Sequence, residues 1–224
     1  MIKDIWLIPY LIFISLAVSD LMLIYLNHFA QKRGLAPKKY FWGIDRYFIN
    51  YKSRNISYWF VKIASLMIMV SIYLQYGFSL SSFKFIILFH LLIIIGITDV
   101  HYKIIPNEIN LLGIIAGLII VFLNGGSGNL ITKVYILIFT LLFLLLFSFM
   151  SLGGIGGGDI KLIALLGVYV GWQNNIIILT ISILLAFLVN TYMLITKKRK
   201  FGDKFEFGPY LVIGTMLNYI LYIM

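Results

Sequence analysis

Two aspartates in this chain, Asp99 and Asp159, have the setting that acid–base chemistry requires. Asp99 closes a long apolar run, and Asp159 opens another directly after the glycine-rich stretch GGIGGG. Both fall at the same predicted membrane boundary, so the carboxylates can face each other between two helix ends. Two close carboxylates cannot both ionise easily, and one of them keeps a proton. The ionised member can take a proton from water while the protonated member donates to a carbonyl oxygen, which is the arrangement an aspartic peptidase needs.

The other acidic residues have simpler interpretations. Glu108 begins a predicted helix, where a carboxylate interacts favourably with the N-terminal dipole. Asp20 lies within the first apolar span, and we expect a structural or substrate-contact role there because charges inside a membrane are costly. Solvated charges in polar stretches account for Asp4, Asp45, Asp203 and Glu206.

The glycines before Asp159 have two interpretations. Gly156, Gly157 and Gly158 lack Cβ atoms, so the backbone there can approach a substrate closely. The alternative is a mobile turn between two membrane helices. No Gly-Lys-Ser/Thr follows, which excludes a phosphate loop.

The composition predicts no metal and no cofactor. The three histidines, His28, His90 and His101, are scattered without a metal-binding spacing. The chain has no cysteine, which excludes disulfides, thiolate zinc sites and cysteine nucleophiles.

The balance of residue types indicates that lipid is the solvent for much of the chain. Of its 224 residues, 62% are hydrophobic and 12% charged, with a mean hydropathy of +1.01, whereas soluble domains carry about 25% charged residues. We predict an all-α polytopic membrane helix bundle of about eight transmembrane segments, because open sheets leave unpaired backbone groups in lipid. The apolar stretches are 5–27, 57–77, 83–99, 108–124, 130–150, 159–172, 175–195 and 208–223. The sixth is short, and we expect it to begin inside the bundle.

The distribution of the charges behind the net charge of +10 indicates which loops face the cytoplasm. Only Lys3, Lys84 and Lys133 fall on one side of the predicted bundle and Lys62 inside a span, while all other Lys and Arg gather on the opposite side. Basic loops stay in the cytoplasm, so both termini are predicted outside, with the first span retained rather than cleaved as a signal peptide. No recognition module accompanies the charge, so we expect no nucleic-acid partner.

Two regions divide the predicted bundle. Residues 1–82 form an N-terminal membrane region with a basic cytoplasmic loop at 28–56, whose aromatic residues place it against membrane lipid. Residues 83–224 form the region that carries both aspartates.

Three motifs of the second region resemble the type IV prepilin peptidase family. Gly156-Gly157-Gly158-Asp159 matches its Gly-x-Gly-Asp signature, the segment DVHYKIIPN resembles its first catalytic region, and FEFGPYLVIG resembles a third element. Together they cover about residues 85–224 in the family's order. The resemblance implies removal of short basic leaders from prepilins or pseudopilins at the cytoplasmic face of the inner membrane. It implies that Asp99 and Asp159 are catalytic and that Lys161 has a local structural or substrate role.

The first third of the chain departs from the family pattern. Many members carry a cytoplasmic loop with two Cys-x-x-Cys pairs that can bind zinc, and they methylate the new pilin N-terminus. This chain has no cysteine, so we predict an aspartic endopeptidase without N-methyltransferase activity. A cation-coupled transporter is the alternative, although no internal repeat supports it. An inactive membrane scaffold and a related peptidase acting on other signal peptides also stay open.

Overall fold

The computed structural model describes residues 8–32, 56–151, 154–198, 200 and 206–223, and every regular element among them is helical. Residues 33–55 of the predicted basic loop lie outside this part of the chain. The elements are α1 (Ile8–Lys32), α2 (Ile56–Tyr76), α3 (Leu80–Tyr102), α4 (Asn107–Met150), α5 (Gly157–Val170), α6 (Trp172–Ile195), α7 (Gly208–Asn218) and a π-helical turn (Tyr219–Ile223). The predicted all-α fold is therefore confirmed over the described residues.

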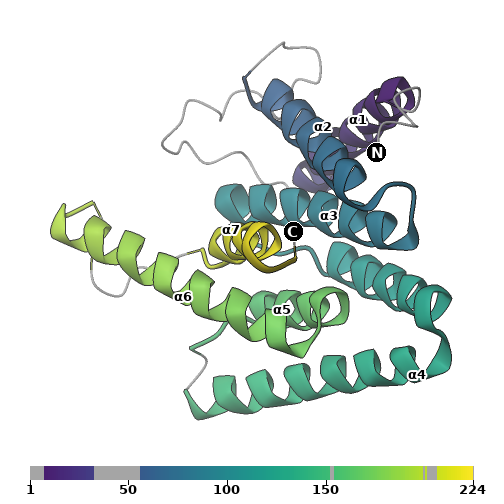
Figure 1. The fold of residues 1–224 in the computed structure, drawn as a ribbon. Coiled ribbons are helices and arrows are strands. Elements are labelled where there is room, and N and C mark those ends of the chain that lie inside the picture. Colours follow the sequence, from purple (N-terminus) through teal and green to yellow (C-terminus); the bar gives the residue numbers. More distant parts are fainter. Residues whose placement is uncertain (1–7, 33–55, 152–153, 199, 201–205, 224) are drawn as a thin grey trace. The chain divides into compact units, whose positions relative to one another are not determined.

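Helices occupy all eight predicted apolar stretches, because α4 covers two of them. Gly126 interrupts α4 with non-helical backbone angles (φ 67°, ψ −163°), and the chain reverses its direction there (Figure 1). Among the described residues, 4 helices are long and apolar enough to cross a membrane: α1, α3, α4 and α6.

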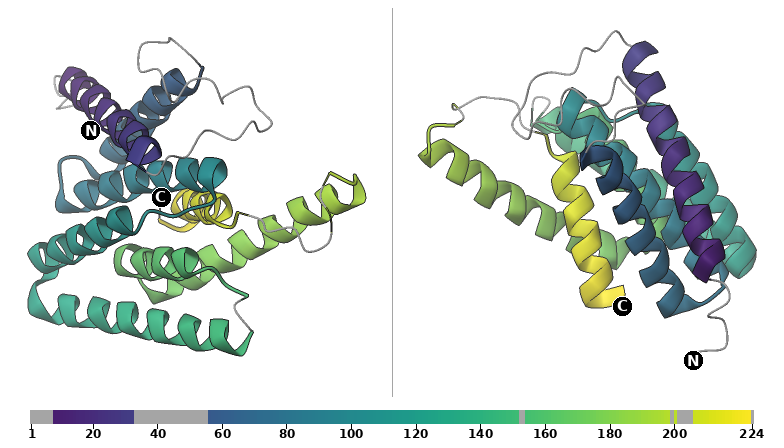
Figure 2. Two further views of the ribbon diagram at one scale, coloured as in Figure 1. Left: turned by 180° about the vertical axis from the view of Figure 1, so that it is seen from behind. Right: turned by 90° about the horizontal axis from the view of Figure 1, so that it is seen from above.

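Helix α5 is different from its neighbours because it is short and buried. Its 14 residues extend about 21 Å at about 1.5 Å per residue, less than the roughly 30 Å of a hydrocarbon core. Side chains on all its faces are buried from Ile160 to Tyr169, except that of Lys161. Figure 2 (left) shows α5 between the two halves of α4. A helix that is apolar all round belongs in a core, as expected for the short sixth stretch.

Close packing explains how α5 fits between the two halves of α4. A Cβ added at Gly117, in the first half, would lie 2.6 Å from Cε2 of Tyr169, and one added at Gly167 of α5 would lie 2.9 Å from Cγ2 of Ile136 in the second half. Tyr169 also donates a hydrogen bond from its hydroxyl to the Gly113 carbonyl, at 2.8 Å. These contacts fix the position of α5, and with it the residues at its N-terminus.

The chain forms two compact units, Met1–Ile94 and Ile95–Met224, with the boundary inside α3. In the first unit, buried polar side chains join the helices. Ser15 Oγ of α1 lies 3.1 Å from Ser65 Oγ of α2, which lies 2.7 Å from Nε2 of His90 in α3. Membrane helices gain little from hydrophobic attraction to one another, so polar contacts of this kind hold them together.

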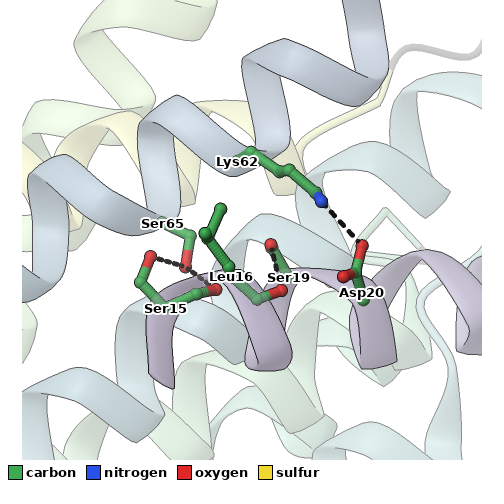
Figure 3. Close-up of polar contacts among 6 residues, drawn as sticks. All are labelled: Ser15, Leu16, Ser19, Asp20, Lys62 and Ser65. Atoms are coloured by element: carbon green, nitrogen blue, oxygen red, sulfur yellow. Dashed lines mark hydrogen bonds and ion pairs between the residues drawn. The ribbon is translucent and has the colours of Figure 1, made fainter. Parts of the chain in front are cut away.

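An ion pair links the same two helices near the serines. Lys62 Nζ of α2 lies 3.0 Å from Asp20 Oδ1 of α1 (Figure 3). Opposite charges inside a membrane protein pair with each other because an isolated charge is costly in lipid. Asp20 therefore has a structural partner on the neighbouring helix.

Candidate active site

Asp99 lies in the last turn of α3, and its side chain is fixed by the start of α7. Only 6% of Asp99 is exposed. Its Oδ2 accepts a hydrogen bond of 2.9 Å from the backbone N–H of Gly208. A Cβ at Gly208 would lie only 2.6 Å from this same oxygen. Glycine at position 208 thus allows the α7 backbone to approach the carboxylate closely enough to bind it.

Helix α3 ends at Tyr102, three residues after Asp99, and the next residue has an unusual backbone conformation. Lys103 donates its N–H to the Asp99 carbonyl at 2.8 Å, closing the last turn, and has a φ of 55°. The left-handed region is a common helix terminator, but glycine usually occupies it. The Lys103 side chain forms an ion pair of 2.7 Å with Glu206, two residues before Gly208.

Asp159 is the third residue of α5 and is half-buried. It lies close enough to Asp99 for the two carboxylates to interact electrostatically. Each carboxylate comes from a helix end, one from the C-terminus of α3 and one from the N-terminus of α5. Such a pair can share one proton, so that one member activates a water molecule and the other protonates a substrate oxygen.

The three glycines before Asp159 meet different surroundings. A Cβ at Gly156 would lie 2.8 Å from Oδ2 of Asp159, and one at Gly158 would lie 3.0 Å from Cβ of Ile105. A Cβ at Gly157 would meet nothing within 4 Å. The contacts give a physical reason for a Gly-x-Gly-Asp pattern, because only the first and last glycine stand where a side chain would collide.

Lys161 follows Asp159 by two residues and connects α5 to the start of α4. Its Nζ donates a hydrogen bond of 2.8 Å to Oδ1 of Asn107, and the Lys161 side chain is exposed. Glu108, beside Asn107, lies in the first turn of α4, where its charge can interact with the helix dipole. No group of three His, Cys, Asp or Glu side chains that could hold a metal ion is found in the described part of the chain.

The structure places the candidate site residues at two helix ends and gives a new role to two charged residues that the sequence interpretation had left outside the site. Asp99, Asp159, the glycines 156–158 and Lys161 lie at or near the end of α3 and the start of α5. Lys103 and Glu206 were interpreted as a topology charge and a solvated charge, yet they form an ion pair next to Asp99. The sequence signal for this segment was the resemblance of FEFGPYLVIG, which contains Gly208-Pro209, to a third element of the family, and the sequence assigned no function to these residues.

Comparison with known proteins shows which family this chain resembles. Residues 86–190 match the family described as "Type IV leader peptidase family". The chain is similar to the protein named "Prepilin leader peptidase/N-methyltransferase" of Bacillus subtilis (strain 168), with 29% identity over 150 residues, 66% of this chain and 59% of that protein. Proteins of the same name from Pseudomonas putida (28% identity, 71% of this chain, 57% of the relative) and Xanthomonas campestris pv. campestris (27%, 73% and 58%) also match.

These relatives are longer than the region they share with this chain. The chain spans less than two thirds of the length of each, between 57% and 59%. No solved structure matches. The long apolar helices, together with the matched family, make this an integral membrane protein. Residues 86–190 thus resemble the type IV leader peptidase family, and the chain is similar over 66–73% of its length to proteins named as prepilin leader peptidases.

Proposed function

We propose that this protein is an aspartic endopeptidase that removes the basic leader peptide from type IV prepilins or pseudopilins. The observation that carries the proposal is that Asp99 and Asp159 each lie at a helix end against a glycine. A Cβ at Gly208 would lie 2.6 Å from an Asp99 oxygen, and one at Gly156 would lie 2.8 Å from an Asp159 oxygen. The relatives named as prepilin leader peptidases give the substrate class. The transporter alternative finds no support in these relatives or in the matched family.

The proposed reaction uses the two carboxylates as a pair. The ionised carboxylate takes a proton from water, and the water oxygen forms a bond to the scissile carbonyl carbon. The protonated carboxylate donates its proton to the carbonyl oxygen. When the carbon–nitrogen bond breaks, a carboxyl group returns a proton to the departing amine. Because the proton belongs to the pair, we assign it to neither aspartate alone.

The glycine segment before Asp159 has a proposed role in binding the substrate. Gly157 is exposed and a Cβ there would meet nothing within 4 Å, so an extended peptide can approach its backbone. Lys161, which is also exposed, has a local structural or substrate role through its link to Asn107.

The proposal places the reaction at the cytoplasmic face of the inner membrane, with prepilin and membrane lipid as partners and no nucleic acid. The distribution of Lys and Arg along the chain supports this face. The relatives' names include an N-methyltransferase, but we propose none here, because the loop between α1 and α2 has no cysteine with which to build a thiolate zinc site.

Incubation of the detergent-solubilised full chain with a prepilin tests the proposal. We expect cleavage after the leader, read from the N-terminus and mass of the product, and a loss of about 10²- to 10⁴-fold in kcat for Asp99→Asn and for Asp159→Asn. Glu108→Gln is the matched control, since Glu108 is an exposed carboxylate on the neighbouring helix, and it should cleave normally. Well-folded protein that leaves several prepilins intact would refute the peptidase, and an added methyl group on the product would refute the absence of methylation.

A further inference from the structure

The segment Glu206–Gly208 runs beside the last turn of α3 and contacts it twice. Gly208 donates its N–H to Asp99, and Glu206 forms its ion pair with Lys103. Asp99 and Lys103 are one helical turn apart, so the two contacts lie side by side along α3. The proposed reaction uses Asp99 but assigns no part to Lys103 or Glu206.

The backbone at position 103 gives an independent reason to assign a role to the lysine. Its φ of 55° is a conformation in which glycine or asparagine is the usual residue. A lysine held there is a backbone outlier beside a candidate site, and such outliers point to a function of the side chain. Lys197 has the same conformation (φ 54°) at the end of α6, and its side chain is exposed. It is therefore a matched control with the same backbone.

The partly exposed setting of the ion pair argues against a purely stabilising role. The Lys103 side chain is 47% exposed and that of Glu206 is 16% exposed. Ion pairs this open to solvent contribute little to stability. The pair does determine where the backbone of residue 208 lies, because Glu206 is anchored only two residues before it. Among the described residues, Gly208 is the one hydrogen-bond donor to the Asp99 carboxylate.

We propose that Lys103 and Glu206 are positioning residues for Asp99. Their ion pair holds the Glu206–Gly208 segment against α3, so that the Gly208 N–H fixes one carboxylate oxygen and leaves the other available to the reacting water. The charge of Glu206 also lies close enough to Asp99 to act on it, and Lys103 balances that charge. This role rests on the proposed peptidase function and adds to it the two residues that orient one of its carboxylates.

Kinetics of single and double variants test the positioning role. We expect Glu206→Gln and Lys103→Met each to lower kcat about tenfold, since small misplacements of catalytic groups cost up to about 10²-fold, with KM changed less than about twofold because substrate contacts are untouched. The kcat of the double variant should fall no further than that of the worse single variant, because both substitutions remove the same ion pair. Lys197→Met should match the unmodified chain. Single variants with normal kcat, or losses that multiply in the double variant, would overturn the proposal.

The pH dependence of kcat separates positioning from a general loss of structure. The charged groups acting on Asp99 from the described elements are Lys103, Glu206 and Asp159. Lys103→Met leaves a negative charge unbalanced beside Asp99, so the acidic limb of the pH–rate profile should move to higher pH. Glu206→Gln leaves a positive charge unbalanced, so the limb should move to lower pH. Shifts in the same direction, or none, would contradict the assignment.

Hydrogen exchange of the Gly208 amide decides the question without any cleavage assay. Gly208 is the first residue of α7, where the helix itself provides no acceptor, so the hydrogen bond to Asp99 accounts for its protection. Glu206→Gln and Lys103→Met should speed this exchange severalfold, and Lys197→Met should not. If the chain cleaves no prepilin but the exchange responds, the proposed function fails and the positioning contact stands. Equal exchange in all variants would refute the contact itself.

Discussion

Replacing Gly158 by alanine tests how closely α5 must approach the α3–α4 connection. The new Cβ would lie 3.0 Å from Cβ of Ile105, and 3.5 Å from its Cγ1 and Cδ1. Carbon atoms in contact prefer about 3.5–4.0 Å. The Ile105 Cβ is attached to the backbone and cannot rotate away, so the two backbones must separate by a few tenths of an ångström. Asp159 is the next residue and moves with them.

The size of the effect follows from this displacement. Overpacking of this kind typically destabilises a protein by about 1–3 kcal/mol. A misplacement of about 1 Å in a reacting group costs up to about 100-fold in rate, so a shift of a few tenths of an ångström predicts a loss of roughly threefold to fivefold in kcat. Gly158→Ala should therefore reduce prepilin cleavage more than its modest loss of stability would suggest.

Gly157→Ala is the matched control for this experiment. It makes the same substitution one residue earlier in the same helix turn, where a Cβ meets nothing within 4 Å. Alanine is also a better helix former than glycine, by up to about 1 kcal/mol. Thermal unfolding in detergent should stay at or slightly above that of the unmodified chain, so Gly157→Ala is the control for the loss of stability; its cleavage rate reports the approach of the substrate instead.

A second-site change identifies the atom responsible. Ile105→Ala keeps the Cβ and should not restore the rate of Gly158→Ala, whereas Ile105→Gly removes the Cβ and should restore part of it relative to Ile105→Gly alone. If Gly158→Ala cleaves and unfolds like the unmodified chain, or if Gly157→Ala destabilises it equally, the packing explanation is wrong.

Three further predictions concern the Asp159 side chain, the packing of α5 and the pH dependence of cleavage. Gly156→Ala should lower kcat with little change in unfolding, because its Cβ would lie 2.8 Å from the mobile end of the Asp159 side chain; kinetics paired with thermal unfolding checks this. Gly117→Ala should destabilise the chain by about 1–3 kcal/mol, since its Cβ would lie 2.6 Å from Tyr169, while Gly128→Ala in the same helix meets nothing within 4 Å; detergent unfolding compares the two. The cleavage rate should pass through a maximum with pH, falling when the pair holds two protons and when it holds none; a monotonic profile of kcat/KM would contradict the shared proton.

The helices of this fold were predictable because the chain is apolar except at short polar interruptions. Each interruption marked a helix end correctly except the one between 124 and 130. There α4 continues, and within it the backbone of Gly126 alone leaves the helical region. The polar residues between the predicted stretches 108–124 and 130–150 are helical apart from this glycine, since glycine is tolerated within a helix. The positions of both aspartates followed from the same interruptions.

The contacts between distant residues were not predictable from the pattern. The ion pairs Asp20–Lys62 and Lys103–Glu206 each join residues on different helices or loops, and they depend on the rotation of each helix about its axis. A hydropathy pattern with few polar residues per helix specifies that rotation poorly. The same limit applies to Gly208, whose importance comes from a carboxylate far away in the sequence.

The burial of α5 explains why its N-terminus can carry a fixed carboxylate. A helix with buried side chains on all faces cannot rotate without disturbing both halves of α4, because Gly117 and Gly167 are packed too closely to allow an added Cβ. The Tyr169 hydroxyl opposes sliding along the axis through its hydrogen bond to α4. Asp159 therefore moves only when the whole helix moves. Changes at either end, Gly158 beside the site or Gly117 far from it, should then reach the same carboxylate, with the nearer one affecting catalysis more than stability.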